Sequence, residues 1–562
     1  MRLPRPDPDT FLDFNEQFQQ AFDLMEQSAK NVFVTGRAGT GKSTLLKYFR
    51  EHTRKNIVVL APTGVAAVNI SGQTIHSFFR FKPDITLGKI KKITFSSLKE
   101  NIYRQLDAIV IDEISMVRAD LLDCVDRFLR LNGKEKYRPF GGIQLIFIGD
   151  LYQLPPVTTD AEKTIFSEHY TSPYFFSAHV LAPPQHQLLP AGEPFAMEMI
   201  ELEKIYRQRD EQFIALLNSI RNNTAGVAEF ALLQTRQLPN FHPGRDDFFI
   251  HLTTTNAMAK ALNDERLHFL KTKLWTFVGQ RRGDFDDKYL PTDSVLTLKP
   301  GAQVMMLNND SRGRWINGTI GQLLAVREKN PEDNSLSEDE VGATVSAPPA
   351  SEEAVLVVEL ENGNTVEVSR YRWDIYEFSY DQKTRRIESD SVGSFTQYPL
   401  KLAWAVTIHK SQGKTFEKVI VDIGRGTFSP GQLYVALSRA TTLEGLVLKQ
   451  PVKKQHIWLD RRVVQFVTTF QYQKSAAALS TADKMKFIAE AINNKHKLAI
   501  TYLKAQDIKS RRVIIPEVIG EMEYAGKKFL GVQAFCLERQ DTRVFRVDRI
   551  LEIRVAEETT VQ

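Results

Sequence analysis

Four short apolar runs in the first 150 residues are each followed by glycine or polar residues. They occupy positions 32–34, 58–60, 108–111 and 145–148. Uninterrupted apolar runs of this length suit the strands of a parallel sheet that is buried on both faces. The pattern predicts an α/β fold in which the polar residues lie at the carboxyl ends of the strands, where such sheets bind their ligands.

The C-terminal part of the chain follows a different pattern. A helical-looking stretch at 461–473 leads into a linker of small residues at 473–483. After a helical start at 484–495, apolar and polar residues alternate in several further runs. Alternation with a period of two is typical of half-buried strands. Residues 484–562 are therefore predicted to form a small antiparallel β-barrel.

The segment 329–354 is polar and acidic, and it contains few large apolar residues. A segment of this composition cannot bury enough apolar surface to fold by itself. We expect a mobile loop here, and an acidic segment that repels DNA is the alternative.

The composition agrees with a folded protein of several domains. The 562 residues exceed one hydrophobic core and predict about three or four packing units. The net charge of +5 is spread over a long chain and decides little about a nucleic-acid partner. Cys124 and Cys536 lack the spacing of metal ligands, and no stretch approaches the roughly 20 apolar residues of a membrane span. We expect a cytoplasmic protein without a membrane anchor.

A glycine-rich segment with the pattern of a P-loop follows the first apolar run. Backbone N–H groups of such a loop cradle phosphates, its lysine reaches the β- and γ-phosphates, and its serine hydroxyl binds Mg²⁺. We therefore expect ATP and Mg²⁺ here, and a glycine-rich turn is the alternative. The predicted nucleotide contacts are Gly36, Gly39, Thr40, Gly41, Lys42, Ser43 and Thr44.

An acidic pair, Asp112 and Glu113, directly follows the third apolar run. At the end of a buried parallel strand, Asp112 can hold Mg²⁺ together with Ser43, and Glu113 can orient and deprotonate the attacking water. Adjacent acidic residues more often form a solvated turn, but the P-loop upstream favours the catalytic interpretation.

The fourth apolar run leads to Gly149, Asp150 and Gln153. Gln153 is predicted to detect the γ-phosphate or the water that attacks it, and Pro155 and Pro156 stiffen the loop. A glutamine that merely caps the turn is the alternative.

Six segments resemble, in this order, the motifs of the Pif-type helicases of superfamily one. They are TGRAGTGKS, APTGVAAVNISGQTIHSFF, VIDEISMV, GDLYQLPPV, WAVTIHKSQGKT and YVALSRA. The resemblance covers about residues 14–470. It implies two RecA-like domains with ATP bound between them, in a motor that moves 5′ to 3′ on single-stranded DNA.

Further residues take their roles from this resemblance. Gln19 is expected to contact the adenine, and Gly413 is expected to lie at the nucleotide. Arg207, in LEKIYRQRDEQF, and Arg439, in GQLYVALSRA, are expected to reach the phosphates from the second domain. A guanidinium there stabilises charge on the transferring phosphoryl group. A surface ion pair is the alternative for each arginine.

The resemblance also implies a nucleic-acid track across both domains. Hydroxyl and backbone N–H groups hold phosphates, and exposed aromatic rings stack on bases of any sequence. For Phe78 and Phe79, packing in the core is the alternative. The expected contacts are Pro62, Thr63, Gly64, His76, Phe78, Phe79, Thr255, Asn256, Thr407, His409, Lys410 and Ser411.

The motifs also set the expected domain limits. The first RecA-like domain is expected at 1–185, with a small wedge insertion at about 80–105. The second is expected at 186–315 and 396–472, around an SH3-like insertion at 316–395.

Residues 484–562 resemble a WYL domain, through Tyr502, Pro516 and the segment RVFRVDRI. This domain is common in bacterial regulators and is believed to sense nucleic acids or nucleotides. The signature triplet stands here as KFL, at 528–530, without its Trp and Tyr, which leaves the ligand open. A solvated charged face is the alternative to nucleic-acid binding. The candidate contacts are Arg512, Arg543 and Arg546.

We therefore expect a bacterial, nucleoid-associated DNA helicase of repair or replication, monomeric at rest, that unwinds duplex or structured DNA. Its C-terminal module is expected to modulate DNA binding. One alternative is a translocase or remodeller that hydrolyses ATP without separating strands. Another is a regulatory nucleic-acid-binding protein, and RNA remains open as a substrate.

Overall fold

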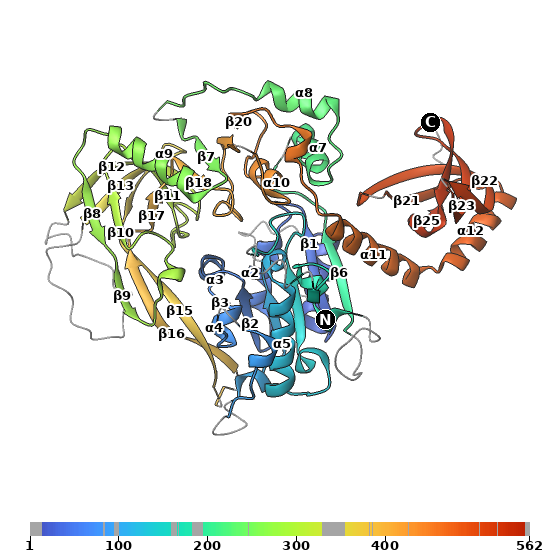
Figure 1. Ribbon diagram of the computed structural model, residues 1–562, viewed down its shortest axis with the longest axis horizontal. Coiled ribbons are helices and arrows are strands. Elements are labelled where there is room, and N and C mark those ends of the chain that lie inside the picture. Colours follow the sequence, from blue (N-terminus) through green and yellow to red (C-terminus); the bar gives the residue numbers. More distant parts are fainter. Residues whose placement is uncertain are drawn as a thin grey trace. The chain divides into compact units, whose positions relative to one another are not determined.

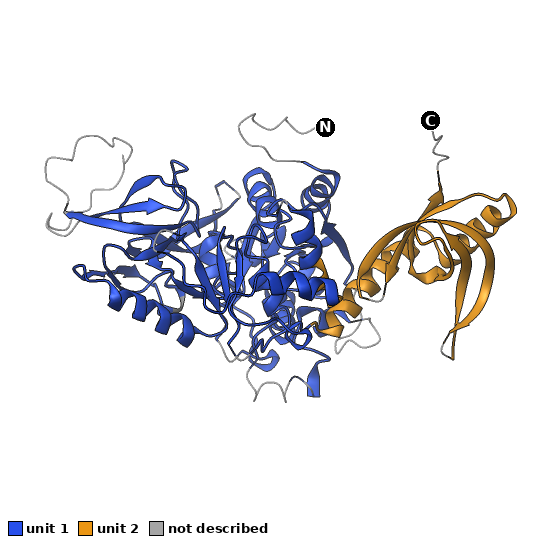
Figure 2. Cartoon of the chain, turned by 90° about the horizontal axis from the view of Figure 1, so that it is seen from above, with its two compact units in different colours: residues 1–217, 227–458 blue, residues 218–226, 459–562 orange. Residues whose placement is uncertain are grey.

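The computed structural model describes residues 14–556 apart from 83–84, 95–100, 159–165, 167, 183–194, 209, 245–246, 329–353, 382, 385, 425, 505 and 525. The chain forms two compact units, one of residues 1–217 and 227–458 and one of residues 218–226 and 459–562 (Figure 2). The acidic segment lies outside the described residues, except for Ala354. Within the described part of the chain, no helix is long and apolar enough to cross a membrane.

A six-stranded sheet in the order β3-β2-β4-β5-β1-β6 forms the first domain (Figure 1), and all its strands run parallel. The apolar runs of the sequence are its central strands, and they are buried because helices cover the sheet. The strands are β1 (Asn31–Gly36), β2 (Ile57–Ala61), β3 (Gln73–Thr74), β4 (Ala108–Ile111), β5 (Gln144–Ile148) and β6 (Met197–Leu202). The helices are α1 (Glu16–Gln27), α2 (Lys42–His52), α3 (Gly64–Asn69), α4 (Ile75–Phe78) and α5 (Ala119–Asn132).

One expected limit of this domain differs from the structure. Strand β6 pairs along its whole length with β1, so the first sheet extends beyond residue 185. The sequence of β6 alternates between apolar and polar residues and follows β5 only after a long gap. No pattern in the sequence therefore indicates which sheet this strand joins. The expected wedge at about 80–105 lies partly outside the described residues, and its described part contains the short helices η1 (Leu87–Lys89) and η2 (Ile102–Arg104).

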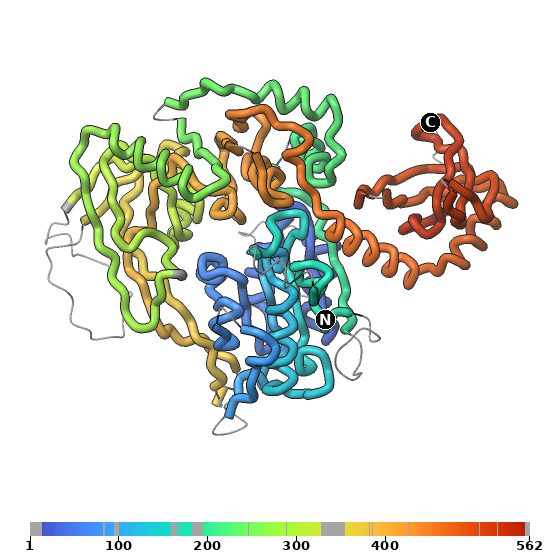
Figure 3. The backbone as a smooth tube through the Cα atoms, in the orientation of Figure 1, coloured from blue at the N-terminus to red at the C-terminus, as the bar shows by residue number. Residues whose placement is uncertain are grey.

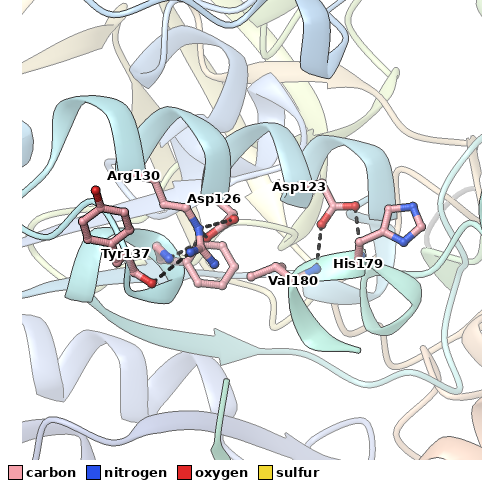
Figure 4. Close-up of polar contacts among 7 residues, drawn as sticks. Asp123, Asp126, Arg130, Tyr137, His179 and Val180 are labelled. Atoms are coloured by element: carbon pink, nitrogen blue, oxygen red, sulfur yellow. Dashed lines mark hydrogen bonds and ion pairs between the residues drawn. The ribbon is translucent and has the colours of Figure 1, made fainter. Parts of the chain in front are cut away.

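Two buried aspartates of α5 fix the loops beside this sheet (Figure 4). Asp123 accepts hydrogen bonds from the backbone N–H groups of His179 and Val180, both at 3.0 Å. Asp126 forms an ion pair with Arg130 at 2.7 Å. Because a buried carboxylate is costly without such partners, these contacts hold the frame around β5 in one arrangement.

A second parallel sheet, in the order β18-β7-β19-β20, belongs to the same compact unit. Its strands come from two distant stretches of sequence, coloured green and orange in Figure 3, because a β-rich insertion separates β7 from the others. The strands are β7 (Ile250–Thr253), β18 (Ala405–Thr407), β19 (Val419–Asp422) and β20 (Leu446–Leu448). The helices of this region are α7 (Glu211–Arg221), α8 (Val227–Thr235), α9 (Asn256–Phe269) and α10 (Gln432–Leu437).

The insertion is larger than the expected 316–395, because its strands already begin at residue 275 and end at 402. It has sheets in the orders β10-β8, β14-β13-β12-β11-β17 and β15-β16-β9. Its strands are β8 (Trp275–Val278), β9 (Gln280–Gly283), β10 (Val295–Leu298), β11 (Gln303–Met306), β12 (Ile320–Glu328), β13 (Ala354–Leu360), β14 (Thr365–Val368), β15 (Tyr371–Asp381), β16 (Arg386–Gln397) and β17 (Leu400–Leu402).

The second compact unit contains an antiparallel sheet in the order β24-β23-β22-β21-β25, packed with the helix α12 around one apolar core. The predicted linker at 473–483 is wrong, because α11 continues to Ala478 and α12 begins at Thr481. Alanine-rich sequence suits a helix as well as a linker. The elements are α11 (Arg461–Ala478), α12 (Thr481–Asn493), β21 (Leu498–Lys504), β22 (Ile508–Tyr524), β23 (Lys527–Cys536), β24 (Asp541–Arg546) and β25 (Ile550–Val555).

Candidate functional site

The P-loop joins β1 to α2, and Lys42 is the first residue of that helix. Its Nζ donates to the carbonyl oxygens of Gly36, at 2.7 Å, and Arg37, at 2.9 Å, so the ammonium lies inside the loop. Gly39 has a φ of +81°, and a Cβ atom there would lie 2.4 Å from the Cβ of Arg207. Only glycine allows the Arg207 segment to approach the loop this closely.

A cavity of about 630 Å³ opens beside the P-loop, and we call it the nucleotide cleft. Its walls come from both parallel sheets of the first compact unit. The predicted residues that it brings together are Gly39, Thr40, Gly41, Lys42, Ser43, Thr44, Asp112, Glu113, Gln153, Arg207, Gly413 and Arg439.

The carboxyl end of β4 carries Asp112 and Glu113 into this cleft. Glu113 has a φ of 51°, which is uncommon for a residue with a side chain and is typical of functional sites. Burial raises the pKa of both carboxyl groups, and the charge of Asp112 raises that of Glu113 further, while Lys42 opposes both shifts. The Asp112 carboxylate and the Ser43 hydroxyl line the same cleft and are the kind of oxygen ligands that Mg²⁺ prefers.

Gln412 connects this acidic pair to the second sheet. Its Nε2 donates to Glu113 Oε2 at 3.0 Å and reaches Gln153 Oε1 at 3.5 Å. Gln153 in turn donates to Asp150 Oδ2 at 3.3 Å and is 8% exposed. The side chain of Gln153 thus points among polar groups of the cleft and does not merely cap its own turn.

Arg207 and Arg439 enter the cleft beside each other. Arg439 is 1% exposed and donates to three backbone carbonyls, those of Val435, Ser411 and Lys414, at 2.9–3.4 Å. Burial, and then the charge of Arg207, lower the pKa of Arg439 to about 9. Among the described residues, neither arginine forms an ion pair with a carboxylate, so this part of the cleft favours an anion.

The expected adenine contact, Gln19, does not lie in the lining of the cleft. Its side chain bonds Asp23 Oδ1 at 3.1 Å, whereas its neighbour Phe18 lines the cleft. Sequence reasoning also missed Tyr206, Ile316 and Thr415, which line the cleft. Tyr206 directly adjoins Arg207 and Thr415 ends a motif, and that adjacency was the available signal, whereas no motif adjoins Ile316.

A second cavity, of about 450 Å³, opens at the carboxyl ends of β7 and β18, and we call it the second-sheet pocket. Five of the predicted nucleic-acid contacts line it, together with two residues that sequence reasoning missed, Thr254 and Phe428. The Phe428 ring is 56% exposed and lies nearly parallel to the His409 ring, with 6.3 Å between centroids. The five predicted residues are Thr255, Asn256, Thr407, His409 and Lys410.

Ser411 was expected to contact nucleic acid as well, but its side chain is fully buried. Its hydroxyl donates to the Ile408 carbonyl at 2.8 Å, so it stabilises the turn after β18. The alternation of residues in a tight turn brings Lys410 outward and Ser411 inward, which the motif alone does not indicate.

The aromatic contacts expected in the first domain are also corrected. Phe78 and Phe79 are 6% and 1% exposed and pack edge to face in an aromatic cluster with Tyr103 and Phe128. They belong to the core, which was the alternative. Thr63 remains exposed and caps α3 through its Oγ1, which accepts from the Ala66 N–H at 3.3 Å. The remaining expected residues here, Pro62, Gly64 and His76, are half-buried around α3 and α4.

The C-terminal arginines divide into two groups. Lys504, which sequence reasoning missed, has its pKa lowered by burial and then by Arg512, Arg539 and Arg543, so these four cations lie near one another. Arg543 forms only a long ion pair with Asp541, at 3.8 Å, whereas Arg546 forms a close one with Asp548, at 2.7 Å, and lies over the Phe529 ring. The unit thus has a cluster of cations that excludes Arg546.

Comparison with known proteins gives three family matches along the chain. Residues 14–225 match the PIF1-like helicases, residues 402–447 match the UvrD-like helicase C-terminal domain, and residues 483–555 match the WYL domain. The first and last matches agree with the resemblance read from the motifs.

Whole-chain comparisons agree. The chain is 32% identical over 461 residues to the ATP-dependent DNA helicase Pif1 of Psychrobacter sp. (strain PRwf-1), covering 76% of this chain and 67% of that one. It is 31% identical over 462 residues to human ATP-dependent DNA helicase PIF1, covering 81% of this chain and 63% of that one. It spans about two thirds of the length of these relatives.

Solved structures give the same answer. The structure of Bacteroides sp. Pif1 in complex with ADP-AlF4 is similar with a TM-score of 0.69 and 36% identity, covering 82% of this chain and 98% of that one. The two parallel sheets, the cleft between them and the order of the motifs have one explanation. The chain belongs to the PIF1-like helicases, a family of ATP-dependent DNA helicases, and carries a C-terminal WYL domain.

Proposed function

We propose that this protein couples ATP hydrolysis in the nucleotide cleft to 5′-to-3′ movement along single-stranded DNA and to unwinding of the duplex ahead. The observation that carries the proposal is the composition of the cleft. The P-loop and the acidic pair follow strands of the first sheet. Arg439 and Gly413 come from the region of the second sheet. Hydrolysis therefore needs both domains in contact.

We assign the roles of the cleft residues as follows. Lys42 and the P-loop N–H groups bind the phosphates, and Ser43 and Asp112 are the residues that would hold Mg²⁺, which neutralises phosphate charge when bound. Glu113 accepts the proton of the attacking water, and Gln153 and Gln412 orient its carboxylate and the water. Arg207 and Arg439 stabilise the charge of the transferring phosphoryl group.

The DNA strand is proposed to cross the second-sheet pocket. The hydroxyl groups of Thr255 and Thr407 and the ammonium of Lys410 suit phosphates, and the exposed Phe428 ring suits a base. These groups do not distinguish one base sequence from another, which a motor that moves along DNA requires. A Bacteroides Pif1 has been solved bound to single-stranded DNA, and other Pif1 helicases have been solved at forked double-stranded DNA, which supports this assignment.

The WYL domain is proposed to add a second nucleic-acid contact through Lys504, Arg512, Arg539 and Arg543. Four neighbouring cations suit a phosphate backbone. The module would then tune how tightly the motor holds DNA.

The test measures ATP hydrolysis with and without an oligothymidylate, and strand displacement on duplexes that carry either a 5′ or a 3′ single-stranded tail. We expect single-stranded DNA to stimulate hydrolysis and only the 5′-tailed duplex to be unwound. A rate of ATP hydrolysis that is the same with and without DNA would refute the motor function. Unwinding of the 3′-tailed duplex would refute the 5′-to-3′ polarity.

A further inference from the structure

A short loop between β11 and β12 meets three parts of the machinery. The Ile316 side chain is 67% exposed and lines the nucleotide cleft. Gly318 has a φ of +106° and lies against the side chain of Lys414, with 3.6 Å from its would-be Cβ to the Lys414 Cβ. Between them, Asn317 reaches α3 of the first domain. The nucleotide contacts assigned above do not use this loop.

Both ends of the Asn317 carboxamide are occupied. Its Nδ2 donates to Asn69 Oδ1 at 3.0 Å, and Asn69 is the last residue of α3. Its Oδ1 accepts a hydrogen bond from Lys414 Nζ. The backbone N–H of Asn317 donates to Asn309 Oδ1 at 2.8 Å, which fixes the loop itself. One side chain therefore joins the first domain to a residue that follows the second sheet's β18.

Lys414 makes this junction sensitive to the nucleotide cleft. It stands between Gly413 and Thr415, which both line the cleft, and its carbonyl accepts a hydrogen bond from Arg439 at 3.0 Å. Burial lowers the pKa of its ammonium to about 8, so the group depends on the acceptor that Asn317 provides. A shift of the 413–415 segment must move or break the contact with Asn317.

We propose that Asn317 is a positioning residue that couples nucleotide occupancy of the cleft to the position of α3. Ile316 and the 413–415 segment sense the nucleotide, and Asn317 passes their displacement to Asn69. Helix α3 begins directly after Thr63, which is exposed and stands among the expected DNA contacts. The inference rests on the proposed function, because it assumes that the first domain grips DNA near α3.

Thermodynamic linkage gives the proposal a direct readout. If the link couples the two sites, an ATP analogue changes the affinity for DNA, and DNA changes the affinity for the analogue by the same factor. A residue with only a structural role would alter stability without altering that factor. We therefore measure the affinity of the full chain for a fluorescent oligothymidylate with and without Mg²⁺-AMPPNP, together with the thermal unfolding midpoint.

Two single variants and their combination test the link. Asn317→Ala removes both hydrogen bonds of the carboxamide. Asn69→Ala removes only the hydrogen bond between Asn317 and Asn69, and because Asn69 is exposed, its truncation spares the core. We expect Asn69→Ala to reduce the coupling factor by about 3- to 10-fold, as the loss of one hydrogen bond between neutral groups allows. Asn317→Ala should reduce it at least as much, because that variant also loses the hydrogen bond from the Lys414 ammonium. Because both residues act in one link, the double variant should be no worse than Asn317→Ala. Asn364→Ala, at an exposed turn of the same insertion, is the matched control and should keep the wild-type factor.

The outcomes separate this inference from the function on which it rests. If DNA does not stimulate ATP hydrolysis by the wild-type protein, and if its affinities for DNA and for the ATP analogue are independent, both the proposed function and this inference are overturned. A coupled wild-type protein whose coupling survives in Asn317→Ala or in Asn69→Ala would overturn the link alone. Additive losses in the double variant would also overturn it, because they place the two residues in separate paths.

Discussion

The nucleotide cleft and the second-sheet pocket hold their functional groups in opposite ways. In the cleft, Gln153 and Arg439 are buried and Glu113 is half-buried, and all three are hydrogen-bonded to residues 411–412. In the second-sheet pocket, Lys410 is exposed and Phe428 is 56% exposed. Buried charges act strongly because little solvent screens them, whereas exposed groups contribute small and nearly independent amounts.

This difference indicates that the nucleotide cleft and the second-sheet pocket have different tasks. A dry, charged cleft stabilises one transition state, and its residues act as a unit. A wet, shallow pocket lets a strand bind, slip and bind again, which needs many weak contacts. Substitutions in the cleft should therefore change turnover by about 10²- to 10⁴-fold. Substitutions at the DNA surfaces should change affinity by smaller factors, at most about 100-fold.

The largest effect is expected for Arg439→Lys. Lysine keeps the charge but cannot reproduce the planar fork that serves the phosphates and the 411 and 414 carbonyls. We expect kcat for DNA-stimulated ATP hydrolysis to fall by about 10³-fold, as for other arginines that complete a phosphoryl-transfer site. Steady-state kinetics measure it. Arg54→Lys, at an exposed position outside the cleft lining, is the control, and near-normal turnover of Arg439→Lys would remove this residue from the transition state.

Glu113→Gln should follow, with kcat lower by about 10²- to 10⁴-fold and little change in the Kd for ATP. The amide is isosteric and cannot accept the proton of water, whereas Asp112 is left to hold Mg²⁺. Turnover and nucleotide binding by fluorescence anisotropy separate the two effects. If ATP affinity fell along with turnover, Glu113 would be a binding residue and not the base.

The cleft was predictable from the sequence to the extent that its groups lie in short motifs. Asp112 directly follows an apolar strand, and Lys42 and Gln153 lie a few residues after the ends of two others, so their place at one sheet edge follows from the fold class. Gln19 was not predictable in this way, since a helix turns about 100° per residue and a one-residue error in register moves the side chain to a different face of the helix. Phe18 faces the cleft instead.

The DNA surfaces were less predictable because exposure depends on tertiary packing. Phe78 and Phe428 are chemically identical, yet the first is 6% and the second 56% exposed. Phe78 meets Tyr103 from a distant segment, and no local pattern predicts that contact. The extent of the first sheet was missed for the same reason, because β6 reaches its partner β1 only through long-range pairing.

Phe428→Ala tests the exposed side of the comparison. Loss of one stacking surface should weaken binding of single-stranded DNA by about 5- to 100-fold, while ATP hydrolysis without DNA stays at the wild-type level. Anisotropy titrations with oligothymidylate measure it, and Phe269→Ala, at another exposed phenylalanine, serves as the control. An unchanged affinity would show that no base stacks in the second-sheet pocket.

The smallest effect is expected in the WYL domain, for Arg543→Ala. Each cation that contacts a phosphate adds about one counterion to the salt dependence of binding, so the slope of log K against log salt should become shallower by about one, with an affinity loss of only a few-fold. Arg546→Ala is the matched control from the same sheet, because its guanidinium is already paired with Asp548 and should contribute little to the slope. Titrations at several salt concentrations compare the two. Equal slopes in both variants and the wild type would restrict DNA binding to the motor domains. A larger change in slope for Arg546→Ala than for Arg543→Ala would show that Arg546, and not the cation cluster, contacts the DNA.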